Sequence, residues 1–396
     1  MATPSYRRTR VICVSDTHNC PVSLPKGDVL IHAGDLTNQG THSELAKAVQ
    51  WLEKADFEAK IVVAGNHDIT LDRDFYAVNG SHFHNQKLED PEKCISLLAS
   101  SSSITYLCHS QAVIRLKKEE GPQTIFKVFG SPYSPRTGNW AFMYEGSALD
   151  FDEDTTHSRN YPVPSRAGAS TIDSLYGLPS SVTRAAEIWS AIPLDADIVV
   201  THTPPFEHCD QSASSQSLGC LELRKALYRV RPRLHVCGHV HTGRGAELVR
   251  WDYVDGKVPT EPEVRVWQDP GLGPGNRRLS RVDLAPQRRN LEQWLVPQAN
   301  QRASAHSASR ARKDQSHSTA CGDYTSNLPL SHSVDVSLNP SHIPQRRPLA
   351  PDCPRSETCV VNCSIMATSW PHVGGKRFNK PIVVDLDLPV WRQEPE

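Results

Sequence analysis

Five short apolar runs in this chain each lead into Asp, Asn or His residues, and this arrangement constrains the fold more than any other feature. The runs occupy residues 11–15, 29–33, 61–64, 197–200 and 234–237. Continuous apolar runs of this length are typical of strands that are buried on both faces of a sheet. Patterns of helical spacing lie between them, so the sequence predicts a layered α/β domain with polar residues at the ends of its strands.

Further elements surround these runs. The segments after His42 and over 218–230 repeat apolar residues at helical spacing, and 111–116 with 124–129 indicate a β-hairpin. Residues 381–388 predict a last strand.

The composition changes between residues 285 and 357, where Gln, Arg, Ser, His and Pro dominate. Such a stretch has too little apolar surface to offset the entropy of ordering it, so we expect a disordered insertion. The predicted domain therefore comprises 10–284 and 358–390, and residues 391–396 form a tail.

Charge and cysteine content exclude some classes of protein. The 43 Lys and Arg balance 44 Asp and Glu, which disfavours general attraction to nucleic acid or to anionic membranes. The 11 Cys show no zinc-knuckle or disulfide spacing and are expected to be free thiols of a reducing compartment. We find no signal-peptide pattern and no apolar run of about 20 residues, so we expect a soluble, cytoplasmic protein.

The polar residues at the strand ends are of the types that hold metal ions. They are Asp16, His18, Asp35, Asn66, His202, His239 and His241. Oxygen donors mixed with imidazoles, without thiolates, suit Mn, Fe or Zn. If the chain leaves each strand in extended form, residues i and i+2 face the same way, so Asp16 with His18, and His239 with His241, would point into one cleft.

The order of these residues resembles the calcineurin-like metallophosphoesterases, whose motifs are DxH, GD, GNH[DE], H and GHxH. All five occur here in that order, from Asp16-Thr-His18 to Gly238-His-Val-His241. The branch that the chain looks most similar to is that of the class III cyclic-nucleotide-phosphodiesterase-like proteins and brain metallophosphodiesterases. This likeness includes residues 130–135, 140–142, 201–205 and 231–241.

The resemblance implies a four-layer α/β/β/α sandwich of two mixed β-sheets flanked by helices. It also implies that two divalent metal ions, Mn, Fe or Zn, are bound. One ion would be held by Asp16, His18, Asp35 and His241, and the other by Asp35, Asn66, His202 and His239. His67 would face the phosphate as a catalytic residue, and Asp68 would orient or tune it. A hydroxide between the ions would attack phosphorus.

The leading prediction is therefore a phosphodiesterase that acts on a small nucleotide-like substrate. Two alternatives stay open, a Ser/Thr protein phosphatase or other phosphomonoesterase, and a metal-binding scaffold with little turnover. We expect His32, His109, His208 and His235 to be ordinary hydrogen-bonded histidines, and Arg244 is a weaker candidate for contacting a substrate phosphate. The sequence does not predict an oligomeric state.

Overall fold

The structure, a computed structural model, describes residues 5–145, 181–251, 261, 263–273, 275–284, 293–296, 355–368 and 375–391. The chain divides into one compact unit, Met1–Val296 with Ser356–Glu396, and a second, Pro297–Arg355. All described residues except Arg355 belong to the first unit. Most of the predicted insertion at 285–357 lies outside the described residues, so its disorder and its boundaries stay predictions.

The first sheet has six strands in the order β13-β16-β1-β2-β3-β4. Their bounds are β1 (Tyr6–Val14), β2 (Val29–Ala33), β3 (Ala59–Val63), β4 (Thr105–Tyr106), β13 (Ser280–Asp283) and β16 (Ile382–Pro389). β1 pairs antiparallel with β16 and parallel with β2, so the sheet is mixed. The predicted last strand is confirmed as β16, which lies in the interior of this sheet.

The second sheet has eight strands in the order β14-β12-β11-β15-β10-β9-β6-β5, and β7 and β8 form a separate pair. The bounds are β5 (Ser110–Arg115), β6 (Ile125–Ser131), β7 (Ser134–Pro135), β8 (Met143–Tyr144), β9 (Ile198–Thr201), β10 (Leu234–Cys237), β11 (Gly245–Arg250), β12 (Glu263–Trp267), β14 (Trp294–Leu295) and β15 (Glu357–Asn362). The predicted hairpin is confirmed by the antiparallel pairing of β5 with β6. Several strands were not predicted, among them β14, which falls within 285–357, and β15, which lies between β10 and β11.

Five α-helices are described: α1 (His42–Lys54), α2 (Arg73–Phe83), α3 (Pro91–Ala99), α4 (Ser181–Ser190) and α5 (Leu221–Val230). Two short 3₁₀ helices, η1 (Ile69–Leu71) and η3 (His241–Gly243), follow β3 and β10. The helix expected after His42 is confirmed as α1, which begins there because Thr41 and Glu44 form a capping box. Leu45, Val49 and Leu52 make its buried face.

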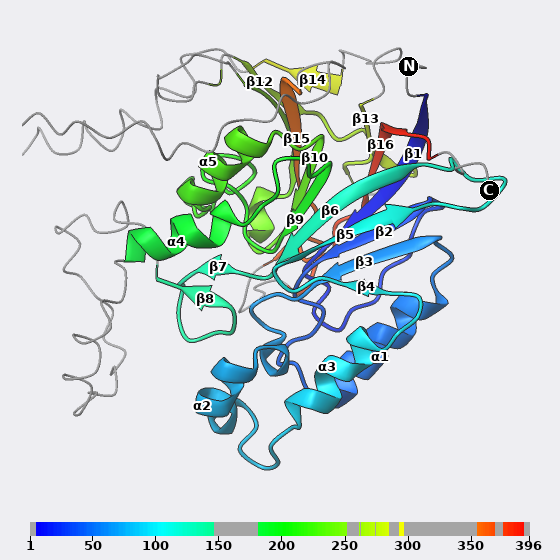
Figure 1. The fold of residues 1–396 in the computed structure, drawn as a ribbon. Helices are drawn as coiled ribbons and strands as arrows, with labels where there is room; N and C mark the ends of the chain where they lie inside the picture. The colour runs from blue at the N-terminus through cyan, green and yellow to red at the C-terminus, as the bar shows by residue number, and fades with distance from the viewer. Residues whose placement is uncertain are drawn as a thin grey trace, which may run out of the picture. The chain divides into compact units, whose positions relative to one another are not determined.

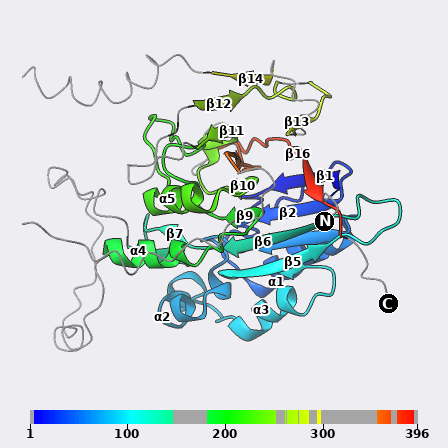
Figure 2. The same cartoon turned by 45° about the horizontal axis from the view of Figure 1, so that its top comes forward.

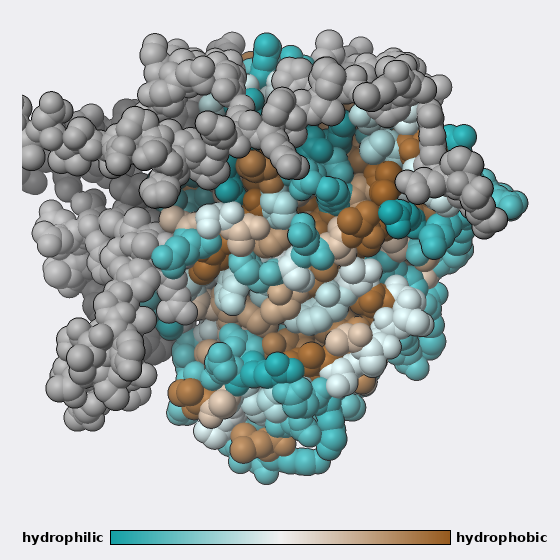
Figure 3. Space-filling model, viewed as in Figure 1, coloured by the Kyte–Doolittle hydropathy of each residue, from teal (hydrophilic) through white to brown (hydrophobic). Residues whose placement is uncertain are grey.

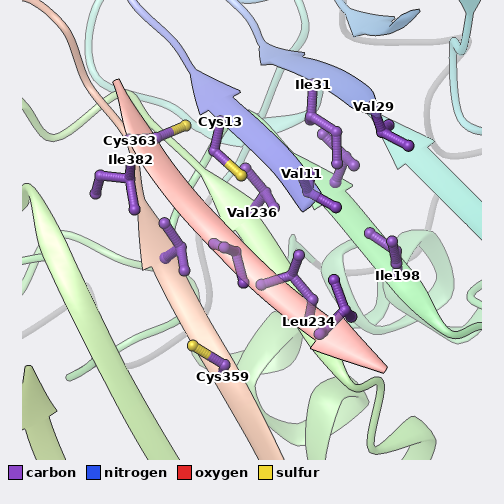
Figure 4. Packing of buried hydrophobic residues seen from close by; sticks show 14 of the residues in the cluster. Val11, Cys13, Val29, Ile31, Ile198, Leu234, Val236, Cys359, Cys363 and Ile382 are labelled. Atoms are coloured by element: carbon purple, nitrogen blue, oxygen red, sulfur yellow. The ribbon is translucent and has the colours of Figure 1, made fainter. Parts of the chain in front are cut away.

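Three apolar clusters lie between the layers of sheets and helices. One fills the space between the sheets, and Figure 4 shows part of it, including Val11 and Cys13 from β1 and Leu234 and Val236 from β10. A second joins the first sheet to α1, α2 and α3, and a third joins the second sheet to α4 and α5. Figures 1 and 2 show these two helix groups on the outer sides of the sheets. The predicted α/β fold with two mixed sheets flanked by helices is confirmed.

The surface offers no broad apolar area on the face that Figure 3 shows, where hydrophobic residues are interspersed with hydrophilic ones. The most exposed large apolar side chains of the described residues are Val78, at 75% in α2, and Leu272, at 70% between β12 and β13. Isolated exposed apolar side chains are normal for a folded protein. No helix in the described ranges has the length and apolar character required to cross a bilayer.

Candidate metal centre

The ends of five strands bring the seven predicted metal ligands together. β1 leads to Asp16 and His18, β2 to Asp35 and β3 to Asn66. β9 leads to His202, and β10 leads to His239 and His241. The carboxyl ends of β1, β2 and β3 meet because these strands are parallel, and β9 and β10 are parallel in the second sheet. All seven side chains are buried or half-buried.

Asp16, His18 and His241 form the first donor group, with ligand atoms that lie within 4.8 Å of one another. Asp16 Oδ1 lies 3.5 Å from His241 Nε2. His18 donates its Nδ1–H to the Thr37 carbonyl oxygen at 3.2 Å, which leaves the Nε2 lone pair available. A backbone carbonyl that fixes the other ring nitrogen is the usual second contact of a metal-ligating histidine.

Asn66, His202 and His239 form the second donor group. Asn66 Oδ1 lies 3.0 Å from His202 Nε2 and 2.9 Å from His239 Nδ1. His202 donates its Nδ1–H to the Ala33 carbonyl oxygen at 2.9 Å, so its Nε2 also faces the other donors. The two groups thus have the same construction, with one imidazole in each fixed by a backbone carbonyl.

Asp35 lies between the two groups. Its Oδ2 is 3.7 Å from His18 Nε2 and 3.4 Å from His202 Nε2. Its Oδ1 accepts a hydrogen bond of 2.8 Å from the backbone N–H of His67. One carboxylate oxygen therefore contacts a member of each donor group.

The backbone at these positions is turned sharply. Asp16, His18, Asp35 and His239 have φ of 53°, 43°, 53° and 66°. The expectation that Asp16 and His18 converge because the chain is extended was therefore wrong, since both residues adopt left-handed conformations. Such conformations cost roughly 1 kcal/mol or more for a residue with a Cβ atom, and they are found where surrounding structure holds a functional side chain in place.

Glycine in the GNH and GHxH motifs has a packing reason. A Cβ atom on Gly65 would lie 2.2 Å from Asp35 Oδ1, and one on Gly238 would lie 2.3 Å from Asp16 Oδ2. A side chain at either position would displace a predicted ligand. These glycines let the loops approach the two carboxylates closely.

The charge of the site fits divalent cations. Asp16 and Asp35 are 0% and 2% exposed, and no Lys or Arg in the described part of the chain forms an ion pair with either. Burial alone would raise the pKa of Asp35, but the charges of His202, His67 and His18 outweigh burial and hold this pKa well below its usual value. Buried carboxylates need compensating positive charge, and this mixture of carboxylate, amide and imidazole donors suits a metal ion.

His67 lies beside these donors and is held on three sides. Its Nδ1–H donates to the Asn38 carbonyl oxygen at 2.8 Å, and its ring centroid lies 4.0 Å from that of Trp140. The His67 ring also meets the His18 ring edge-on at 4.9 Å. Trp140 was not predicted as a site residue. Its loop is fastened to the site because Ala141 N–H donates to the Asn66 carbonyl oxygen at 3.3 Å.

Asp68 contacts the backbone of the site loops. Its carboxylate accepts hydrogen bonds from the N–H groups of Gly65, Leu36 and Thr37, and from the Thr37 hydroxyl. It therefore joins the GNH loop to the GD loop. The His67 imidazole bonds to the Asn38 carbonyl oxygen, so Asp68 is linked to His67 through these loops and not through its ring.

A comparison with known protein families identifies the family of this chain. The model of the calcineurin-like phosphoesterase family matches residues 9–243, which include all seven donors. The chain belongs to the calcineurin-like phosphoesterase family. This match ends before β15 and β16, so the family pattern does not cover these two interior strands.

Relatives within the family include the metallophosphoesterase domain-containing protein 1 of Homo sapiens, which is 34% identical over 251 residues, 61% of this chain and 63% of that protein. A UPF0046 protein of Caenorhabditis elegans is 32% identical over 241 residues, 60% of this chain and 64% of that protein.

A third relative, named probable rhamnogalacturonate lyase C of Emericella nidulans, is 40% identical over 245 residues, 61% of this chain. The match covers only 18% of that protein, so its name carries no activity over to this chain. The chain spans less than two thirds of the length of each of these relatives.

The histidines that match no family ligand are hydrogen-bonded, as predicted. His32 Nε2 pairs with the Thr17 hydroxyl, His109 Nδ1 with the Ser131 hydroxyl, and His235 Nε2 with the Thr201 hydroxyl. Arg244 is engaged elsewhere, since its guanidinium lies 2.9 Å from Asp269 Oδ2 and donates to the Lys380 carbonyl oxygen. These contacts weigh against Arg244 as a phosphate ligand of the family site.

His208 belongs to a second buried group, which we call the His208 cluster: His208, Glu247, Glu261, Arg224 and Glu207. The His208 ring lies 2.7 Å from Glu247 through Nδ1 and 3.2 Å from Glu261 through Nε2. Arg224 pairs with Glu261 at 2.8 Å and also with Glu207. Burial alone would lower the pKa of His208, but its bonds to the two carboxylates raise it to about 9.

Proposed function

We propose that this protein is a phosphoester hydrolase that uses two divalent metal ions bound at the centre described above. The single observation that carries the proposal is the position of Asp35 Oδ2, 3.7 Å from His18 Nε2 and 3.4 Å from His202 Nε2. A carboxylate placed between two donor groups of this kind suits a pair of ions roughly 3.5–4 Å apart, the separation found in two-metal hydrolases.

In this proposal, Asp16, His18, Asp35 and His241 hold one ion, and Asp35, Asn66, His202 and His239 hold the other. When bound, the ions supply Lewis acidity, which makes water a stronger nucleophile at neutral pH and offsets the charge of the phosphoryl group. The metal is Mn, Fe or Zn, because the donors are oxygen and imidazole nitrogen without thiolate.

The residue proposed to contact the substrate is His67. Its Nδ1–H is committed to the Asn38 carbonyl oxygen, so Nε2 is the ring atom free to meet the substrate. In the protonated ring, Nε2–H would donate to a phosphoryl oxygen or to the departing oxygen. Trp140 limits rotation of the ring by stacking on it, and Asp68 acts as a positioning residue by fixing the loop that carries His67.

We propose a small nucleotide-like phosphodiester as the substrate. Support comes from the resemblance to the phosphodiesterase branch over residues 130–135 and 201–205. The name of the related metallophosphoesterase domain-containing protein 1 specifies no substrate, so the motif resemblance is the support for this choice. A cytoplasmic location and a single small-molecule partner, without nucleic acid or membrane, belong to the same proposal.

The test is hydrolysis of bis-p-nitrophenyl phosphate and p-nitrophenyl phosphate by metal-stripped protein resupplied with Mn, beside Asp35→Ala. We expect metal-dependent turnover that Asp35→Ala abolishes and a higher rate on the diester. A higher rate on the monoester, or on a phosphopeptide, would instead support a phosphomonoesterase or protein phosphatase. Two bound ions without turnover on any of the three would support the scaffold alternative.

A further inference from the structure

The Asp16 carboxylate is held by a residue far along the chain. The Ser364 hydroxyl lies 2.7 Å from Asp16 Oδ2, and both residues are 0% exposed. Ser364 is 348 residues beyond Asp16 and lies outside the part of the chain that the family model matches. The hydroxyl is also 2.9 Å from Asn362 Oδ1, but this oxygen already accepts the Ser364 N–H at 3.1 Å. The single hydroxyl proton goes to the ionised acceptor, which makes the stronger hydrogen bond.

Asn362 holds the opposite side of the same centre. Its side-chain amide donates to the carbonyl oxygens of Val240 at 2.9 Å and Gly238 at 3.4 Å, which flank His239 in the GHxH loop. It also donates to the Cys209 carbonyl oxygen at 2.9 Å. Asn362 is 0% exposed, so these bonds are shielded from water and none of the three carbonyls is left unpaired.

The backbone between these residues joins the two sheets at the metal centre. Ser15 N–H, at the end of β1, donates to the Cys363 carbonyl oxygen at 3.1 Å. Cys363 N–H donates to the Cys237 carbonyl oxygen, at the end of β10, at 2.9 Å. Ile365 N–H returns to the Ser15 carbonyl oxygen at 2.8 Å. Residues 362–365 therefore lie between the strand that leads to Asp16 and the strand that leads to His239.

The placement of this segment follows from the pairing of β15. β15 runs parallel to β10 with Asn362 opposite Cys237, so the chain leaves β15 at the level where β10 ends. Because β15 is an interior strand, its register is fixed by pairing on both sides, with β10 and with β11. Ser364 is thus placed by the sheet rather than by a free loop.

From these contacts we propose that Ser364 is a positioning residue for the metal centre and that Asn362 supports it. The Ser364 hydroxyl donates to Asp16 Oδ2, and both carboxylate oxygens also accept the His239 backbone N–H at 3.1 Å. Together these bonds fix the carboxylate with Oδ1 3.5 Å from His241 Nε2, in position for a metal ligand. The segment after residue 357 thereby completes a site whose seven ligands all lie before residue 242. The inference rests on the proposed function because it assumes that the centre binds metal.

The experiment measures Mn²⁺ affinity by isothermal titration calorimetry of the metal-stripped, full-length protein. Partners that orient metal ligands typically contribute about 10–100-fold to metal affinity. Ser364→Ala is therefore expected to weaken the affinity of one of two ions by that factor, because Asp16 belongs to one donor group. Ser364→Cys, which keeps the side chain's size but donates only weakly, is expected to do the same.

Ser134→Ala is the matched control, because Ser134 is also fully buried and its hydroxyl has no hydrogen-bond partner in the described structure. Thermal unfolding of each metal-free variant shows that it is folded. Mn²⁺ affinity of both Ser364 variants within twofold of Ser134→Ala would overturn this inference and leave the proposed function standing. A wild-type protein that binds no Mn²⁺, Fe²⁺ or Zn²⁺ would overturn both.

Discussion

The metal centre and the His208 cluster are both buried groups of histidines and carboxylates, but they are neutralised differently. In the His208 cluster, both ring nitrogens contact carboxylates, and Arg224 adds a second positive charge. In the metal centre, His18 and His202 each use one nitrogen on a backbone carbonyl and turn the other toward the remaining donors. No Lys or Arg among the described residues pairs with Asp16 or Asp35.

The difference shows how to distinguish a structural network from a binding site. A buried carboxylate is stable only with a compensating cation. The His208 cluster contains Arg224 as a permanent cation, whereas the carboxylates of the metal centre have imidazoles beside them, arranged around positions that metal ions can occupy. The following predictions test this distinction.

The largest effect on folding is expected for Glu247→Ala in the His208 cluster. Removing Glu247 leaves the buried His208 Nδ1–H without its acceptor, and His208 keeps only Glu261, which it shares with Arg224. Breaking a buried pair in this way typically costs about 3–5 kcal/mol in the free energy of unfolding. Urea denaturation measures this change. Glu92→Ala is the control, because Glu92 pairs with Arg73 on the surface and such pairs contribute roughly 0–1 kcal/mol. A loss no larger than that of Glu92→Ala, or a weakened Mn²⁺ affinity, would contradict the structural role.

The same cluster predicts a loss of stability at high pH. The pKa of His208 is raised to about 9, so its contribution is fully present below the unfolded value near 6.5 and is lost as pH rises through 9. This shift corresponds to about 3 kcal/mol. The charged groups around His208 are Glu247, Glu261, Arg224, Glu207 and Asp210.

Glu261 makes the stability of the cluster depend on pH at the acid end as well. Burial alone would raise its pKa, but His208 and Arg224 lower it to about 2, so its contribution is present above the unfolded value near 4.5 and is lost toward pH 2.

The loss of stability at high pH is measured as the difference in unfolding free energy between metal-free wild type and His208→Gln. This difference should shrink between pH 6.5 and 9.5; a constant difference would mean that His208 is neutral in the folded protein.

Metal addition should stabilise the protein only through the metal centre. Mn²⁺ at 100 times its dissociation constant adds about 2.7 kcal/mol per site to the unfolding free energy. Asp35→Asn should lose most of this gain, and Glu247→Ala should keep it despite its lower starting stability. Equal gains in wild type and Asp35→Asn would place the bound metal elsewhere.

The smallest effect concerns the ring that stacks on His67. Trp140→Ala is expected to lower kcat about tenfold, equivalent to about 1.4 kcal/mol, because the imidazole gains freedom to rotate. Mn²⁺ affinity should be unchanged, and Trp140→Phe should restore most of kcat because it keeps an aromatic face. Unchanged kcat in Trp140→Ala would show that the Asn38 carbonyl alone holds His67.

Much of the site could be predicted from the sequence because its ligands occur in short motifs at the ends of recognisable strands. The motif residues from Asp16 to His241 do meet, although the left-handed backbone at Asp16 and His18 replaced the extended geometry expected. The left-handed turns depend on contacts with the neighbouring loops, such as His18 N–H to the Asp35 carbonyl oxygen, and periodicity carries no information about these contacts.

The contributions from distant segments could not be predicted. β15 follows a stretch of low apolar content, and its place between β10 and β11 depends on pairing with strands more than 100 residues earlier. Ser364 has no local signal, because a serine after a strand is common and its contact lies 348 residues away. Glu247 and Glu261, the carboxylates that contact His208, lie 39 and 53 residues from it along the chain. The sequence could therefore predict that His208 is hydrogen-bonded, but not which residues bond to it.

The central claim is that Asp35 lies between two metal ions. Anomalous diffraction from Mn²⁺-soaked crystals of the full-length protein tests it most directly. The account predicts two peaks roughly 3.5–4 Å apart with the Asp35 carboxylate between them. A single peak, or peaks that do not contact Asp35, would contradict it.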